Sequence, residues 1–147
     1  MAEKKISELT AKGAALATTD LMVISEVSGA SYVTKSVTGA DIINPRVQSV
    51  VSAATVTATS LNDLVKITAQ AAGLTLANPT GTFAEGQALI FRIKDNGTAR
   101  AITFGANFRA VGVTLPTTTT ISKTTYVGCI YNSTDTKFDV IASLTEA

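Results

Sequence analysis

The chain has 147 residues, a formal net charge of +1 and 16% charged residues, a balance that gives neither a basic footprint for nucleic acid nor an acidic tail. Hydrophobic residues make up 46% of the sequence, yet no apolar run approaches the roughly 20 residues that a membrane-spanning helix needs. Lysines near the start are followed by no apolar stretch of the secretory kind, so we expect synthesis in the cytoplasm without export and no insertion into a membrane.

A β-hairpin and a helical turn are predicted first along the chain. The segments LMVIS (21–25) and SYVTKSV (31–37) are short and apolar, and they flank the turn-like VSGA. Next, Thr38 offers an N-cap with Asp41 three residues later, which is a capping-box start for one short helical turn. Pro45 then ends or redirects that turn.

After Pro45 the sequence reads as a series of short strands. Threonine is interleaved with valine, isoleucine and aromatic residues, which favours β structure, and turn residues recur at a spacing of about 8–12 residues. This spacing of strands and turns predicts an antiparallel β-sandwich or jelly-roll-like domain. We find no repeat of 20 to 50 residues and therefore expect no solenoid. The predicted strands are residues 54–59, 64–68, 74–77, 88–94, 99–104, 108–111, 124–131 and 138–143.

The strongest local pattern is RIKDNGTARAITFG, residues 92–105. Asn96 and Gly97 both tolerate positive φ and favour a tight turn, and alternating apolar residues stand on either side. The pattern predicts that the strand before the turn and the strand after it pair as a hairpin.

Together these elements divide the chain into a mainly β protein with two modules. We expect an N-terminal attachment module at residues 1–45, a linker at 46–52 and the C-terminal β domain at 53–147. A module of about 45 residues rarely builds an independent core, so this one should order on a docking surface. We expect Ile6, Leu9 and Leu21 to be the apolar residues that anchor the module on that surface.

The sequence contains few of the residues and motifs that are typical of catalytic sites. It has no histidine, no phosphate-binding loop, no dinucleotide fingerprint and no zinc-ligand spacing, so we expect no catalytic residue, no cofactor and no metal. Cys129, the single cysteine, lies in an alternating apolar strand and is predicted to be a small buried hydrophobe. Asp135 and Asp139 could form the carboxylate pair of a glycosidase, but Asp135 falls in a turn, where aspartate is expected anyway.

The notable cationic group consists of Arg92, Lys94, Arg100 and Arg109. On the predicted hairpin Arg92, Lys94 and Arg100 share the polar face, where they could bind an anionic glycan or an acidic partner. The alternative is a solvated strand face whose charges discourage edge-to-edge aggregation.

Two parts of the chain carry a resemblance to a known class of protein. Residues Gly86 to Ala142 include the runs RIKDNGTARAITF, FRAVGVTLPTTT and YVGCIYNSTDTKFDVIA, and they resemble a C-terminal β domain of fibre and appendage proteins of tailed bacteriophages. The N-terminal run is similar to the start of many phage appendage proteins, where a KISEL-like opening precedes a strand that contains Asp-Leu. That run reads KKISELTAKGAALATTDLMVISEVSGASYVTKSVTGADI.

The resemblance implies a non-enzymatic structural protein on the surface of a virion, made in the host cytoplasm. The expected form is a short head fibre or capsid decoration protein, a homotrimer docked through its N-terminal module on major capsid or tail proteins. The alternatives are a tail-associated fibre or adaptor protein, and a module that binds host-surface glycan. A polysaccharide depolymerase is the enzymatic alternative.

Overall fold

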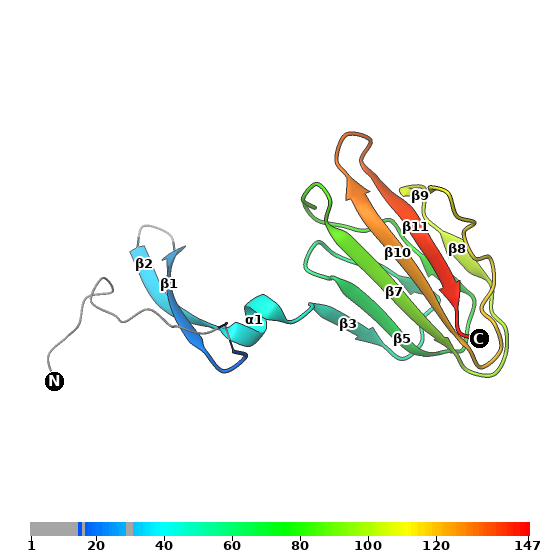
Figure 1. Cartoon of the computed structure of the whole chain (residues 1–147), viewed down its shortest axis with the longest axis horizontal. Coiled ribbons are helices and arrows are strands. Elements are labelled where there is room, and N and C mark those ends of the chain that lie inside the picture. Colours follow the sequence, from blue (N-terminus) through cyan, green and yellow to red (C-terminus); the bar gives the residue numbers. More distant parts are fainter. Residues whose placement is uncertain (1–14, 16, 29–30) are drawn as a thin grey trace, which may run out of the picture. The chain divides into compact units, whose positions relative to one another are not determined.

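The chain is mainly β and divides into two compact units, Met1–Asn44 and Pro45–Ala147 (Figure 1). The computed structural model describes residues 15, 17–28 and 31–147. Each unit has its own sheets, and the description below takes them separately.

The N-terminal unit contains the predicted hairpin. Strand β1 (Leu21–Ser28) pairs antiparallel with β2 (Ser31–Thr38), in a register that joins Leu21 to Thr38 and Ser28 to Ser31. The two strands form a sheet of their own. The hairpin prediction is therefore confirmed, with each strand slightly longer than the apolar pattern indicated.

Helix α1 (Gly39–Ile43) follows directly and begins as predicted. The Thr38 hydroxyl accepts a hydrogen bond from the Asp41 N–H at 3.3 Å, and the Asp41 carboxylate accepts one from the Thr38 N–H at 2.9 Å. The Thr38 hydroxyl also donates to the Asp41 carboxylate at 2.6 Å, and this bond, with the one from the Thr38 N–H, lowers the pKa of the Asp41 carboxyl because both favour its charged form. Asn44 is the C-cap, in an extended conformation that suits the residue before a proline, so the helix ends ahead of Pro45.

The C-terminal unit has two sheets. A six-stranded sheet has the order β3-β5-β7-β10-β11-β9, and a three-stranded sheet has the order β4-β6-β8 (Figure 1). The nine strands are β3 (Val47–Val50), β4 (Thr55–Val56), β5 (Leu64–Gln70), β6 (Leu74–Leu76), β7 (Ala88–Asp95), β8 (Ile102–Phe104), β9 (Phe108–Ala110), β10 (Thr124–Asn132) and β11 (Lys137–Thr145). Each of the predicted strands corresponds to one of β4 to β11.

The sheets are mixed, so the prediction of purely antiparallel pairing is wrong. Strands β3, β5 and β7 run parallel, as do β4, β6 and β8, and β9 pairs parallel with β11. Antiparallel pairing joins β7 to β10 and β10 to β11. Apolar alternation reports which side chains face the core, and it carries no information on the direction of the neighbouring strand.

From β3 to β8 the chain winds between the two sheets like a short coil. Odd-numbered strands join the six-stranded sheet and even-numbered strands join the three-stranded sheet, and each strand lies parallel to the one a full turn earlier. We expected no solenoid because the sequence shows no repeat, yet this segment is wound in the solenoid manner. Its turns differ in length, because β3, β5 and β7 start at residues 47, 64 and 88. The sequence therefore shows no fixed period.

The segment predicted as a linker, 46–52, contains strand β3. This strand lies at the edge of the six-stranded sheet and pairs with β5. Its start is held by Arg46, whose guanidinium donates to both carboxylate oxygens of Asp63 at 3.0 and 2.6 Å. The Arg46 side chain lowers the pKa of the Asp63 carboxyl through these bonds.

The predicted pairing of residues 88–94 with 99–104 is wrong. Strand β7 pairs with β5 and β10, whereas β8 belongs to the other sheet. Gly97 does adopt the predicted positive φ, at +102°, but Asn96 does not, so the chain bends here without forming the predicted tight Asn-Gly turn. After Gly97 the chain crosses from the six-stranded sheet to the three-stranded sheet, so β7 and β8 do not pair.

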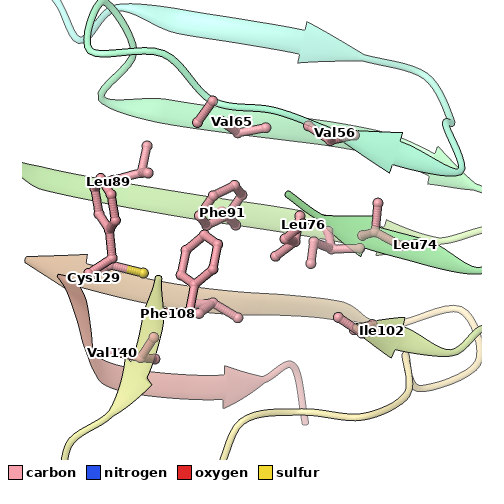
Figure 2. Close-up of a cluster of buried hydrophobic side chains, with 14 of the residues drawn as sticks. Val56, Val65, Leu74, Leu76, Leu89, Phe91, Ile102, Phe108, Cys129 and Val140 are labelled. Carbon is pink, nitrogen blue, oxygen red and sulfur yellow. The ribbon is translucent and has the colours of Figure 1, made fainter. Parts of the chain in front are cut away.

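The space between the sheets is filled by aliphatic and aromatic side chains from both (Figure 2). Phe91 of β7 contacts Phe108 of β9 edge to face, with ring centroids 5.7 Å apart. Cys129 is buried among them, as predicted, and burial raises the pKa of its thiol to about 12, so the thiol stays protonated at neutral pH. The buried hydrophobic residues are Val56, Ala58, Val65, Ile67, Leu74, Leu76, Leu89, Phe91, Ile93, Ile102, Phe108, Val127, Cys129, Phe138 and Val140.

Two buried polar side chains, Gln70 and Asp95, stand where β5 and β7 end. Their backbones are register partners, so they lie side by side. The Gln70 amide donates to the carbonyls of Ala53 and Ala72, at 2.8 and 2.6 Å, and so joins the β3–β4 crossing to the β5–β6 crossing. The Asp95 carboxylate accepts hydrogen bonds from the β7–β8 crossing and the loop beside it: Gly97 N–H at 2.7 Å, Ser122 N–H at 2.9 Å and Thr119 Oγ1 at 2.6 Å.

Replacing Asp95 should make the fold less stable and less sensitive to acid. Burial raises the pKa of this carboxyl, but hydrogen bonds from Thr119, Ser122 and Gly97 outweigh burial and hold the pKa below its usual value. The stabilisation is therefore complete above the unfolded-state pKa, near 4, and is lost as the pH falls through the folded-state pKa. We expect Asp95→Ala to reduce the free energy of unfolding at neutral pH by about 2 to 3 kcal/mol, because buried donors lose a charged acceptor.

Urea unfolding at pH 7 and pH 3 measures this. Asp95→Asn should lack the part of the acid destabilisation that Asp95 contributes in the wild type. As a matched pair, Thr119→Ser keeps the donor hydroxyl and should cost less than Thr119→Val. An Asp95→Asn protein with the full wild-type pH dependence would contradict the assignment.

Gly105, after β8, is expected to resist any side chain. A Cβ at this position would lie 2.7 Å from the backbone nitrogen of Asn78 and would also clash with the Asn78 side chain. That side chain accepts a hydrogen bond from Asn107 N–H at 2.9 Å and cannot move away freely. Gly105→Ala should therefore cost about 1 to 3 kcal/mol in thermal or urea unfolding. Gly73→Ala is the control, because a Cβ there meets nothing within 4 Å and should have little effect.

Candidate functional site

The outer face of the six-stranded sheet, which points away from the core, is divided into an apolar half and a cationic half. Cα pairing aligns its residues in rows across the strands. One row runs Val47, Leu64, Ile90, Gly128 and Ala142, and the next row runs Ser49, Lys66, Arg92, Tyr126 and Leu144. Beyond the second row, Lys94 pairs with Thr124.

Arg92 and Lys94 lie two residues apart on β7 and project to this outer face, so they line one cavity together. The cavity has a volume of about 260 Å³. Its lining residues come from β5, β7 and β10 and are Ile67, Thr68, Arg92, Lys94, Thr124 and Tyr126. The sequence prediction therefore placed these two cations correctly on one face.

Lys94 is held in place by two hydrogen bonds, whereas Arg92 has no such partner among the described residues. The Lys94 ammonium donates to the Ser122 carbonyl at 2.8 Å and to the Glu146 carboxylate at 3.3 Å. Glu146 also accepts from Thr124 N–H at 2.8 Å, and the bonds from Thr124 and Lys94 lower the pKa of its carboxyl. Within the described residues, Arg92 makes no hydrogen bond or ion pair.

Arg100 does not join this group, contrary to the prediction. It lies in the crossing between β7 and β8, where its backbone pairs with Thr119. Its Nε is buried without a hydrogen-bond partner in the described structure. The prediction failed because it assumed that residues 88–94 and 99–104 form one hairpin.

Lys66 takes the place that Arg100 was expected to fill. It is the register partner of Arg92 on the neighbouring parallel strand β5 and is only partly exposed. Like Arg92, it has no hydrogen bond or ion pair within the described part of the chain. Alternation along β5 could have placed Lys66 on the outer face, but its meeting with Arg92 depends on a parallel register that the sequence does not reveal.

The predicted attachment residues belong to the N-terminal unit. Ile6 and Leu9 lie outside the described residues. Leu21 begins β1 and is 68% exposed. The three residues that follow it are also exposed, and they are Met22, Val23 and Ile24.

Asp135 and Asp139, considered above as a catalytic pair, both bind one arginine. Arg109 donates to the two oxygens of Asp139 at 2.7 and 3.0 Å and to Asp135 at 2.8 Å. The Arg109 guanidinium lowers the pKa of the Asp139 carboxyl and thus favours its ionised form. A raised pKa is what a general acid would need, so this geometry is that of a structural ion pair between β9 and β11.

No group of three or more His, Cys, Asp or Glu side chains is arranged to hold a metal ion in the described part of the chain. None of the described helical structure has the length and apolarity to cross a membrane.

Comparison of the chain with protein-family models, with curated proteins and with solved structures found no match.

Proposed function

We propose that this protein is a non-enzymatic structural protein of a tailed-phage virion, a short head fibre or capsid decoration protein that assembles as a homotrimer. Its N-terminal unit docks on a capsid or tail protein, and its C-terminal unit is displayed. The resemblance of both ends of the chain to phage appendage proteins supports the class of protein. The observation that carries the attachment role is the exposed apolar hairpin of the N-terminal unit.

Strand β1 exposes apolar side chains on both faces of the hairpin. Leu21 and Val23 are 68% and 66% exposed, and Met22 and Ile24 are 41% and 40% exposed. Because successive side chains on a strand point to opposite faces, these four described residues expose apolar surface on each face of the strand. A lone two-stranded hairpin is marginally stable in water, so a partner surface is needed to bury these residues.

The C-terminal unit has a candidate surface for contact between copies. The apolar half of the outer face of the six-stranded sheet exposes Val47, Ile90, Ile130 and Ile141, each between 38% and 50%. The three-stranded sheet is different, because its outer row is Thr55, Thr75 and Thr103. Burial of the apolar half between copies would leave the threonine row facing solvent, which suits a displayed assembly.

Light scattering during size-exclusion chromatography tests the assembly. The unit Pro45–Ala147, which retains β3, should elute as a trimer. Ile90→Glu with Ile130→Glu should convert it to a folded monomer, because both side chains are already exposed in the single chain and their replacement leaves the core intact. Thr103→Glu on the three-stranded sheet is the matched control and should leave the trimer unchanged. A wild-type unit that is monomeric at micromolar concentration would refute the assembly.

Copy number per purified particle tests the attachment role. Deletion of residues 1–20 should leave the C-terminal unit folded, with an unchanged thermal midpoint, but should abolish incorporation into virions. Polar substitution of Ile6 with Leu9, or of Leu21 with Val23, should act in the same way, because each pair removes apolar anchors from the docking surface.

Thr103→Glu again serves as the control and should be incorporated at the wild-type copy number. Gold labelling of the C-terminus on particles distinguishes a head location from a tail-associated fibre or adaptor. Normal incorporation of the truncated protein would place the attachment surface in the C-terminal unit instead.

A further inference from the structure

Lys66 and Arg92 place two positive charges side by side on neighbouring strands. Register partners on adjacent strands lie about 4.8 Å apart at the backbone, and like charges so placed destabilise a sheet. Lys94 adds a third cation two residues along β7, and the carboxylate nearest to it, Glu146, is already shared with Thr124 N–H. Within the described residues, neither Lys66 nor Arg92 has an anionic partner. An external anion would relieve this repulsion.

The cavity beside these cations has the size and lining of a site for one acidic sugar residue. Its volume of about 260 Å³ is just below the range of roughly 300 to 1,000 Å³ of ordinary small-molecule pockets, so it suits a single ring better than a larger ligand. The Arg92 guanidinium can bind a carboxylate through two parallel N–H donors, and Lys94 adds a point charge. Thr68 and Thr124 place hydroxyls in the lining for sugar hydroxyls, and the 42%-exposed Tyr126 offers an aromatic surface.

We propose that this cavity binds a carboxylate-bearing sugar residue of an anionic polysaccharide, with Arg92 as the bidentate carboxylate ligand and Lys66 and Lys94 as supporting charges. Binding of this kind goes beyond the structural role proposed above and does not depend on it. The cationic half of the outer face carries the site, whereas the apolar half is the surface proposed to pack against other copies, so both can operate in one assembly.

Amide NMR titration of the full-length protein tests the site with trigalacturonate, a defined acidic trisaccharide, and with galactotriose as its neutral counterpart. Trigalacturonate should shift the resonances of Arg92, Thr124 and Tyr126, and added salt should weaken the binding. Galactotriose should bind at least tenfold more weakly, because it lacks the charged acceptor.

Arg92→Gln should reduce the affinity for trigalacturonate at least tenfold, and Lys66→Gln should reduce it by a smaller factor. Lys137→Gln removes the same charge near the turn between β10 and β11 and is the control, with affinity expected to stay within twofold of the wild type. The unfolding midpoint of each variant measures whether the fold is retained, and we expect little change because the Arg92 and Lys66 side chains make no hydrogen bond or ion pair within the described residues.

Three further results would overturn the proposal. Equal affinity of inorganic phosphate and trigalacturonate would indicate a general anion site with no sugar recognition. Tighter binding of hexaglutamate would indicate an acidic protein partner. Unchanged affinity of Arg92→Gln would show that the trisaccharide binds elsewhere. Each result leaves the virion role standing, because incorporation into particles is measured separately.

Discussion

The fold of the C-terminal unit depends on satisfying backbone polar groups where the chain crosses from one sheet to the other. Each crossing takes N–H and C=O groups away from water, and such groups are tolerated only when they are hydrogen-bonded. Gln70 meets this need with its amide at the β3–β4 and β5–β6 crossings, and Asp95 meets it at the β7–β8 crossing with a buried carboxylate. No cation binds Asp95; neutral donors stabilise its charge, as in a buried polar network that is fully satisfied. Both side chains therefore stabilise crossings that lead from the six-stranded sheet to the three-stranded sheet.

The strands were predictable from the sequence, and their connections were not. Alternation of apolar residues located β7 and β10 almost to the residue, and the capping box located α1, because these patterns are local. The pattern around Asn96 and Gly97 indicated a change of chain direction, but such a change leads equally into a hairpin or into a crossing. Two of the donors that hold this crossing at Asp95, Thr119 and Ser122, come from residues more than twenty positions away in the chain, so the local pattern does not contain them. Strand β3 was missed because it is short and follows a proline.

The candidate site was predicted only in part, because local patterns do not reveal which strands are neighbours. Arg92 and Lys94 were grouped correctly because residues two apart on one strand share a face whatever the neighbouring strands are. Arg100 was added and Lys66 left out, since both depend on which strand lies beside β7. The cavity itself involves three strands from distant parts of the sequence, so no single motif could have indicated it. Two cations spaced two residues apart on one strand, such as Arg92 and Lys94, therefore indicate a candidate site. The other residues of that site can be identified only from the register of the neighbouring strands.

The winding of β3 to β8 has a consequence for how the chain is made. Within residues 45–147, the strands that pair with their immediate successor in sequence are β10 and β11, and every other pairing joins segments separated by at least one intervening strand. Strand β10 is also the antiparallel neighbour of β7, in the interior of the six-stranded sheet. A ribosome must therefore release most of the unit before β7 acquires both neighbours, and until then the early turns of the coil expose an open strand edge. Strand β7 thus keeps an open edge during synthesis until residues 124–132 have left the ribosome, and in that interval the edge can pair with another copy of the chain.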